Sequence, residues 1–376
     1  MKIPFNKPQI TEKSIEYILE CFNREKISGG GYFTNQVHAL LEDELGVYKV
    51  LLTTSCTHAL EMSAILLNIG VGDEVIVPSF TFVSTANAFA LRGAKLLFCD
   101  IRSDTLNLDE TKIENLISSK TKAIVPVHYA GVGCEMDSIL EIARAYKTYI
   151  VEDNAHGLFG KYKGRFLGTF GDMATQSFHE TKNFSCGEGG ALIINKNNFA
   201  ERAEIIREKG TNRSTFFRGE VDKYTWLDIG SSYLPADILA ALLLAQLERR
   251  NQIQTKRKQI WNKYYYSLKN WAEKHDIRLP FIPSVCEQSY HLFYLILPSS
   301  EIRKNLINHL EEKEILSVFH YLPLHLSPMG ILMGGSVGDC PVTEDISCRL
   351  LRLPFYNTLS GQEQDIVIDK ILSFKF

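Results

Sequence analysis

The chain has 376 residues, a length that allows two domains with substantial hydrophobic cores. Its formal net charge is -3, and its acidic and basic residues are interspersed, without the basic stripe that a nucleic-acid-binding protein needs. Nucleic acid is therefore excluded as an expected partner.

The amino-terminal region and the cysteines bear on the cellular compartment. Residues 1–8 contain charged and proline residues where a signal peptide has an apolar core, and no segment reaches the length of a membrane span. The 8 cysteines are scattered, without a Cys-x-x-Cys pair or histidines at zinc spacing. We therefore expect a cytoplasmic protein with reduced, mostly structural thiols, no membrane partner and no metal site.

The first two-thirds of the chain alternates short apolar runs with helical stretches, which is typical of an α/β fold. Several of the runs are almost continuously apolar, as in a mostly parallel sheet covered on both faces. The candidate strands are residues 74–78, 95–100, 123–128, 149–153, 174–178 and 191–195. Because ligands bind at the carboxyl ends of the strands in such sheets, we expect the functional site there.

The last third of the chain predicts a second, smaller unit. A long helix is expected after Pro235, with apolar residues at helical spacing, continuing into a polar and basic stretch. We place the domain boundary in that stretch, so that residues 1–250 form a large domain and residues 251–376 a small α+β domain. Near the end, Ser360 and Glu363 have the spacing of a capping box that opens a final helix.

Two segments in the first quarter of the chain predict contacts to a ligand. Residues 53–60 combine Ser, Thr and Cys at the expected start of a helix, where free backbone N–H groups bind anions such as phosphate, although such a cluster is more often only an N-cap. The segment lacks the glycine patterns of dinucleotide-binding folds and of P-loops. Phe82, just after a predicted strand, could stack on a flat ring, with core packing as the alternative.

The stretch from residue 149 to residue 191 carries the clearest chemical signal. Asp153 ends an apolar strand, where a buried carboxylate needs a cationic partner unless it caps a helix. Lys182 follows, ahead of a glycine-rich turn at residues 187–190. Taken alone, each residue is compatible with a structural role. An acid that faces a pyridine nitrogen and a lysine that reaches an aldehyde are together what a pyridoxal phosphate enzyme requires.

Taken together, the motifs resemble the DegT/DnrJ/EryC1/StrS family of sugar-nucleotide aminotransferases over almost the whole chain. They are residues 54–60, 78–82, 125–131, 152–156, 177–183 and 320–325. The resemblance implies the aspartate-aminotransferase-like fold type I of pyridoxal phosphate enzymes, with a mostly parallel central sheet, helices on both faces and a smaller carboxy-terminal α+β domain. It also implies pyridoxal 5'-phosphate as cofactor and a homodimer with active sites at the subunit interface.

The resemblance also implies roles for individual residues. Lys182 corresponds to the Schiff-base lysine, Asp153 to the partner of the pyridine nitrogen and Phe82 to the ring-stacking residue. His156 falls where the family places Gln or His near the cofactor hydroxyl. The implied phosphate ligands are Cys56, Thr57, Ser177 and, from the neighbouring subunit, Ser232, which stands where the family usually has Asn.

The segment between residues 210 and 234 resembles one branch of the family. Members of that branch use L-glutamate to aminate C4 of dTDP-4-keto-6-deoxy-D-glucose, giving dTDP-4-amino-4,6-dideoxy-D-galactose and 2-oxoglutarate for surface polysaccharides such as enterobacterial common antigen or O-antigen. The expected substrate-binding residues are Arg213, Arg218, Lys223, His320 and Tyr321. For the three basic residues, a solvated surface position is the alternative.

Other functions stay open at this point. They are formation of the gluco epimer, amination of another nucleotide sugar, a pyridoxamine-dependent sugar dehydratase and a non-catalytic sugar-nucleotide-binding regulator. Lys182 argues against the dehydratase, in which this position is typically His, and a regulator has no need of the lysine and aspartate pair.

Overall fold

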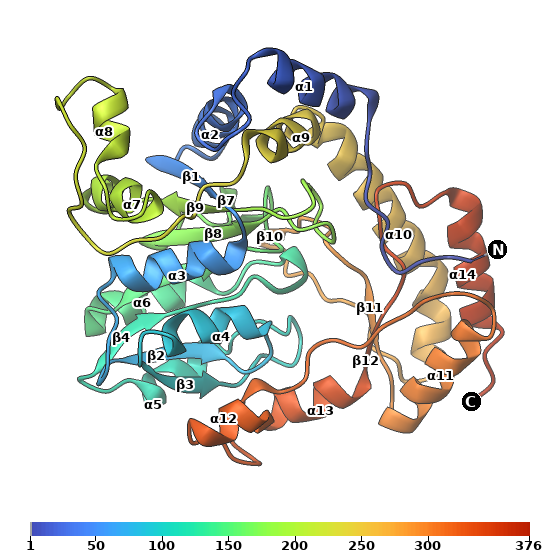
Figure 1. The fold of residues 1–376 in the computed structure, drawn as a ribbon. Coiled ribbons are helices and arrows are strands. Elements are labelled where there is room, and N and C mark those ends of the chain that lie inside the picture. The colour runs from blue at the N-terminus through green and yellow to red at the C-terminus, as the bar shows by residue number, and fades with distance from the viewer. Residues whose placement is uncertain (1) are drawn as a thin grey trace.

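The computed structural model describes residues 2–376 and is built around a seven-stranded sheet with the order β1-β9-β8-β5-β4-β2-β3 (Figure 1). The strands are β1 (Lys49–Thr53), β2 (Glu74–Pro78), β3 (Lys95–Cys99), β4 (Thr121–Ile124), β5 (Tyr149–Asp153), β8 (Met173–Ser177) and β9 (Gly190–Ile194). All neighbouring pairs are parallel except those of β9, which runs antiparallel to β1 and β8. The mostly parallel α/β sheet expected from the sequence is confirmed.

Helices cover both faces of this sheet (Figure 1). Side chains alternate between the two faces along each strand, and apolar side chains on both faces pack against these helices. Val75 and Val77 of β2 pack into one hydrophobic cluster, whereas Ile76 packs into another on the opposite face. The helices that share the cluster of Val75 are α3 (Cys56–Leu66), α4 (Val83–Ala90) and α7 (Ala200–Arg207). Those on the other face are α2 (Tyr32–Leu45), α6 (Met136–Tyr146) and α9 (Asp237–Leu247).

A separate hydrophobic cluster lies in the carboxy-terminal part of the chain. Its main elements are α10 (Arg250–Lys274), β11 (Tyr294–Ile296), α11 (Ser300–Glu311), β12 (Leu350–Arg352) and α14 (Gly361–Leu372). Strands β11 and β12 form a two-stranded antiparallel sheet, and Ile3 near the amino terminus packs into the same cluster. The domain division at residue 250 stays a prediction, and α10 begins at that position.

The remaining elements are short or lie at the periphery. They are α1 (Glu12–Asn23), α5 (Ile113–Leu116), α8 (Arg213–Phe217), α12 (Pro328–Leu332), α13 (Pro341–Arg349) and the three-stranded sheet of β6 (Lys161–Tyr162), β7 (Arg165–Phe166) and β10 (Cys286–Glu287). Within residues 2–376, no helix combines the length and the apolar character needed to cross a membrane.

Two predictions about element ends are wrong, and one is confirmed. The strand predicted over residues 123–128 ends at Ile124, since Pro126 has no N–H to continue the ladder. The single long helix predicted after Pro235 is two helices, because the backbone of Arg249 leaves helical geometry between α9 and α10. The capping box is present: Ser360 accepts from the Glu363 N–H, and the Glu363 side chain accepts from the Ser360 N–H.

Candidate active site

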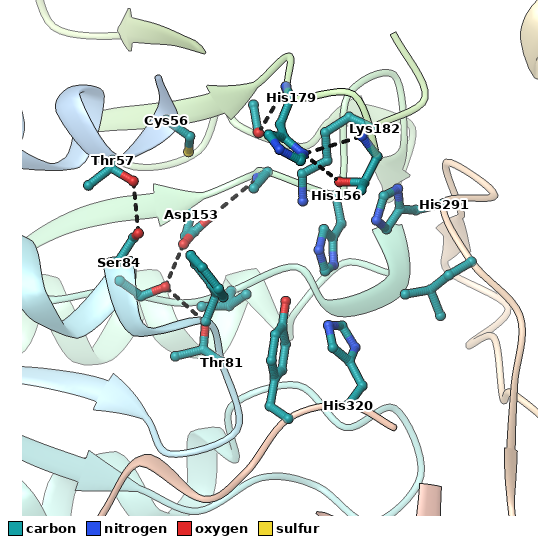
Figure 2. Close-up of a pocket in the computed structure, with 18 of the residues that line it drawn as sticks. Cys56, Thr57, Thr81, Ser84, Asp153, His156, His179, Lys182, His291 and His320 are labelled. Carbon is teal, nitrogen blue, oxygen red and sulfur yellow. Dashed lines mark hydrogen bonds between the residues drawn. The ribbon is translucent and has the colours of Figure 1, made fainter. Parts of the chain in front are cut away.

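A cavity of about 730 Å³ opens where β5 and β8 end (Figure 2). Because these strands are parallel neighbours, their carboxyl ends meet at one edge of the sheet. The expected site residues that line it are Cys56, Thr57, Phe82, Asp153, His156, Ser177, Lys182, His320 and Tyr321. The site predicted at the carboxyl ends of the strands therefore coincides with a real cavity.

Lys182 lies in the loop that follows β8, and contacts to the carboxy-terminal part of the chain hold that loop. Its backbone N–H donates to the His179 carbonyl at 2.9 Å. The side chain of the next residue, Asn183, donates to the Ser289 carbonyl at 2.7 Å and contacts His291 Nδ1 at 2.9 Å. Burial lowers the pKa of the Lys182 amine to about 8. About a tenth of the amine is therefore neutral at pH 7, far more than for an ordinary lysine.

Asp153 ends β5 with its carboxylate in the cavity (Figure 2). One carboxylate oxygen accepts from the Thr85 hydroxyl at 2.7 Å, and the other accepts from the Ala155 N–H at 3.2 Å. No helix begins after Asp153, so the alternative of a helix N-cap is wrong. The carboxylate is buried, and no Lys, Arg or His in residues 2–376 forms an ion pair with it. The Asp153 carboxylate can therefore pair with a cationic group of a ligand.

Glu152, the residue before Asp153, has a different role because neighbouring residues of a strand point to opposite faces. Its side chain is fully buried and lies 2.9 Å from His128 Nε2. It also accepts from the backbone N–H groups of Gly168, Phe170 and Gly171 at 2.7 to 2.8 Å. These bonds fix the end of β5, and thereby the position of Asp153.

The start of α3 forms one wall of the cavity. Ser55 caps this helix by accepting from the His58 N–H at 3.1 Å, and the first N–H groups of a helix, here those of Cys56 and Thr57, have no partner within it. The Thr57 hydroxyl contacts the Ser84 hydroxyl at 2.8 Å. Burial raises the pKa of the Cys56 thiol, so the thiol stays neutral. The positive end of a helix with free donors is suited to a phosphate group.

Phe82 is an aromatic side chain that the chain leaves uncovered. It is 58% exposed although it lines the cavity, and its ring lies 6.4 Å from that of Tyr321. The alternative of core packing is therefore wrong for this residue. An aromatic face that is open to a cavity can stack on a flat ring.

Histidines form the wall opposite α3. The His156 ring stacks on His291 with centroids 4.1 Å apart, and its Nδ1 atom is buried without a hydrogen-bond partner in residues 2–376. His320 contacts the Tyr129 hydroxyl at 2.9 Å. Burial lowers the pKa values of His156, His291 and His320, so these rings are neutral at pH 7. The unpaired Nδ1 of His156 is available to a ligand hydroxyl.

The donor set fits pyridoxal phosphate. It contains an amine for the aldehyde, a carboxylate for the ring nitrogen, an aromatic face for the ring and a helix start for the phosphate. The orphaned Nδ1 of His156 provides a partner for the ring hydroxyl.

Four of the expected site residues lie outside this cavity. The Arg218 guanidinium pairs with Glu204 at 2.9 Å and Glu220 at 2.7 Å, and Arg213 lies 3.5 Å from Glu208. Lys223 and Ser232 are exposed. Within one subunit these residues do not meet Lys182.

Other residues of the site were not predicted from the sequence. They are Thr85, Tyr129, Asn183, His291 and Arg352. Tyr129 and Asn183 belonged to recognised motifs without an assigned role, whereas Thr85, His291 and Arg352 lie outside those motifs. Only the folded arrangement reveals the contacts of these last three residues, because no local sequence pattern marks them.

Comparison with known proteins agrees with this geometry. Residues 8–372 match the model of the DegT/DnrJ/EryC1/StrS aminotransferase family. The chain is 30% identical to GDP-perosamine synthase of Escherichia coli O157:H7, over 99% of this chain and 98% of that protein. It is also 30% identical to the spore coat polysaccharide biosynthesis protein SpsC of Bacillus subtilis, over 98% of this chain and 96% of that protein.

Solved structures of sugar aminotransferases have the same fold as this chain. The pyridoxal phosphate form of a putative sugar aminotransferase from Streptococcus pneumoniae superimposes with a TM-score of 0.90 at 28% identity, over 99% of both chains. Its pyridoxamine phosphate form superimposes with a TM-score of 0.92, over 99% of this chain and 98% of that one. The chain therefore belongs to the DegT/DnrJ/EryC1/StrS family and is a pyridoxal phosphate-dependent sugar aminotransferase.

Proposed function

We propose that this aminotransferase moves the amino group of L-glutamate to C4 of dTDP-4-keto-6-deoxy-D-glucose, forming dTDP-4-amino-4,6-dideoxy-D-galactose and 2-oxoglutarate. The observation that carries the transaminase chemistry is the meeting of Lys182 and Asp153 in one cavity with the free start of α3. The choice of sugar is supported by the resemblance of residues 210–234 to the branch with this activity. The product would serve surface polysaccharide synthesis, such as that of enterobacterial common antigen or O-antigen.

Different residues of the cavity would bind different parts of the cofactor. When bound, pyridoxal phosphate supplies an aldehyde that carries the amino group and a protonated ring that withdraws electrons from the reacting carbon. The Asp153 carboxylate, oriented by Thr85, would keep a proton on the ring nitrogen. Phe82 would cover a face of the ring, while Cys56, Thr57 and Ser177 would hold the phosphate.

Lys182 is the proposed proton carrier of both half-reactions. Its Nζ amine would take the α-proton of glutamate in the first half-reaction and would deliver a proton to C4 of the sugar in the second. A pKa lowered to about 8 by burial suits both tasks near neutral pH. The face of the sugar presented to Nζ determines whether the galacto or the gluco product forms.

We further propose a homodimer in which the four residues outside the cavity act on the partner's site. The segment that carries them exposes large apolar side chains, with Phe217 67% exposed and Trp226 77% exposed. Such a surface favours a protein contact. In the dimer, Ser232 would reach the phosphate of the neighbouring cofactor, and Arg213, Arg218 and Lys223 would lie near the neighbouring sugar nucleotide. Within the cavity itself, His320 and Tyr321 would line the sugar pocket.

A second candidate is amination of a GDP-linked sugar. Two relatives of about the same similarity, from Escherichia coli O157:H7 and Caulobacter vibrioides, are GDP-perosamine synthases at 30% and 31% identity. This candidate differs from the first only in the nucleotide and in the configuration of the sugar.

Product analysis tests the proposal and separates the candidates. The holoenzyme would be incubated with glutamate and either dTDP-4-keto-6-deoxyglucose or a GDP-linked 4-keto-6-deoxyhexose, and the products examined by NMR. We expect amination of the dTDP sugar, with the small H3–H4 coupling of an axial nitrogen. A large coupling would identify the gluco epimer, preferential amination of the GDP sugar would favour the second candidate, and amination of neither sugar would refute both.

A further inference from the structure

Arg257 is a buried arginine of α10 that makes no ion pair within residues 2–376. It is only 2% exposed, and it does not line the cavity. Burial lowers its pKa to about 9, so the guanidinium still carries its charge at neutral pH. A buried cation destabilises a fold unless hydrogen bonds compensate for the lost water. The hydrogen bonds of Arg257 therefore decide what it contributes.

These hydrogen bonds go to two segments that are distant from α10 in the sequence. Nε donates to the Tyr290 carbonyl at 2.8 Å, and Nη2 donates to the His291 carbonyl at 2.5 Å. Nη1 donates to the side-chain oxygen of Asn357 at 2.7 Å, and the guanidinium lies 4.7 Å from the centre of the Phe355 ring. Because the donors of a guanidinium form a rigid planar fork, Arg257 fixes both segments relative to each other.

Both segments contact Asn183, the residue after Lys182. The Asn357 amide donates to the Asn183 carbonyl at 3.2 Å. His291 Nδ1 contacts the side-chain oxygen of Asn183 at 2.9 Å. Two paths of hydrogen bonds thus lead from Arg257 to Asn183, one to its backbone and one to its side chain. Lys182 is one peptide bond farther along the chain.

We propose that Arg257 is a positioning residue that holds the Nζ amine of Lys182 in place for proton transfer, although it does not line the cavity. The inference rests on the proposed function, since it takes Lys182 as the proton carrier of both half-reactions. Proton transfer requires the amine within hydrogen-bond reach of the reacting carbon. A displacement of about 1 Å can therefore cost about a hundredfold in rate.

Stopped-flow absorbance tests this role in Arg257→Met, which keeps an unbranched side chain but loses the hydrogen bonds. The pyridoxal phosphate form is mixed with glutamate, and the pyridoxamine phosphate form is mixed with dTDP-4-keto-6-deoxyglucose. Because Lys182 serves both half-reactions, both rate constants at saturation should fall by a similar factor, roughly 10- to 100-fold. The affinity for each substrate should change by less than about threefold. The amplitudes, which count the loaded sites, should stay unchanged.

Hydrogen exchange of the apoproteins, followed by mass spectrometry, provides a readout that needs no cofactor. It reports how often backbone N–H groups open in each segment. In Arg257→Met, residues 180–186 and 289–292 should exchange at least about threefold faster than in the wild type, because both segments lose their anchor. The amides of β5 should exchange as in the wild type.

Asn357→Asp separates positioning from stability. It keeps an oxygen for Arg257 Nη1 and gives the buried guanidinium a carboxylate partner, but it loses the amide that donates to the Asn183 carbonyl. The urea midpoint of this variant should be no lower than that of the wild type. Both rate constants should nevertheless fall at least about fivefold, and residues 180–186 should exchange faster. This variant decides the question if Arg257→Met fails to fold.

The matched control is Gln364→Met. Gln364 of α14 is also 2% exposed and donates to a backbone carbonyl, that of Ile260 in α10, at 2.6 Å, but it lies outside the cavity. Loss of this buried hydrogen bond should lower the urea midpoint. Both half-reaction rate constants should match those of the wild type.

The outcomes separate this inference from the proposed function. If the wild type responds neither to glutamate nor to the sugar, the proposed function fails, and hydrogen exchange still tests whether Arg257 anchors the Lys182 loop. If the wild type responds but both variants keep its rate constants, the assignment of Arg257 is wrong. A loss in only one half-reaction would overturn it, because that indicates a substrate contact. Lower amplitudes with unchanged rate constants, or an equal loss in Gln364→Met, would overturn it as a general disturbance of the fold.

Discussion

At the scale of single residues, the site depends on side chains that position the reacting groups. Asp153 owes its orientation to the Thr85 hydroxyl, which also contacts the Thr81 hydroxyl at 2.8 Å. These bonds are buried, where a hydrogen bond is strong and an unpaired polar group is costly. Thr85 is thus a positioning residue for the carboxylate.

Thr85→Val keeps the shape of the side chain but removes its hydroxyl. We expect a loss of roughly 1 to 2 kcal/mol in transition-state stabilisation, a five- to thirty-fold fall in kcat/KM, because the carboxylate loses a donor. Steady-state kinetics and the affinity for pyridoxal phosphate measure the effect. Thr358→Val, at an exposed position outside the cavity, is the control. Unchanged kinetics in Thr85→Val would remove Thr85 from this role.

Lys182 also predicts a pH dependence of stability in the apoprotein. The amine keeps its proton up to about pH 10.5 in the unfolded chain but releases it near a pKa of about 8 in the folded chain. Its charge therefore destabilises the fold below pH 8, and this penalty shrinks as the pH rises from 8 to 10.5. Lys182→Met should be more stable than the wild type at neutral pH by roughly 1 to 3 kcal/mol, with the difference falling toward zero at high pH.

Urea unfolding of the two apoproteins near neutral pH and near pH 10 measures this difference. Lys304→Met, at an exposed lysine of α11, should show no such pH-dependent gain. A stability difference for Lys182→Met that grows with pH would show that the lysine is not disfavoured as a cation.

At the scale of elements, the start of α3, where we propose that the phosphate binds, depends on the close approach of three segments. Gly190 begins β9 and pairs with Thr53 at the end of β1 and with Ser177 at the end of β8. A Cβ atom on Gly190 would lie 2.3 Å from the backbone nitrogen of Cys56, at the start of α3. Glycine is required here because the strand passes directly against the helix start.

Gly190→Ala should therefore displace the start of α3 and weaken cofactor binding at least tenfold, with a loss of stability of roughly 1 to 3 kcal/mol from overpacking. Fluorescence titration with pyridoxal phosphate and thermal unfolding measure the two effects. Gly70→Ala, where an added Cβ meets nothing within 4 Å, is the control. Normal cofactor affinity in Gly190→Ala would contradict the role given to this contact.

The elements also show what the sequence could predict. Six of the seven strands of the central sheet were predictable to within a few residues, because buried strands are apolar runs, whereas β1 was missed. Asp153 and Lys182 were predictable because each lies in a short sequence motif. Arg352, Tyr129 and His291 were not, since each meets the site through contacts between distant segments. The break between α9 and α10 was also missed, because nothing in the apolar-to-polar transition marks the departure of Arg249 from helical geometry.

At the scale of the whole molecule, we expect a dimer of two 42.6 kDa chains with shared active sites. Light scattering coupled to size exclusion measures the mass. Ser232→Ala should weaken cofactor binding roughly fivefold, although Ser232 lies outside the cavity of its own subunit, because its hydroxyl would bind the phosphate of the partner's cofactor. The exposed Ser373 provides the control, as Ser373→Ala. A monomeric active enzyme would contradict the shared site.

We propose that Lys182 holds a cofactor that passes an amino group from glutamate to a sugar nucleotide. Visible absorbance of the reconstituted protein tests it most directly. We expect a visible band that glutamate bleaches and dTDP-4-keto-6-deoxyglucose restores, and neither response in a folded Lys182→Ala variant. A wild-type band unaffected by glutamate, or a Lys182→Ala variant that turns over at the wild-type rate, would contradict it.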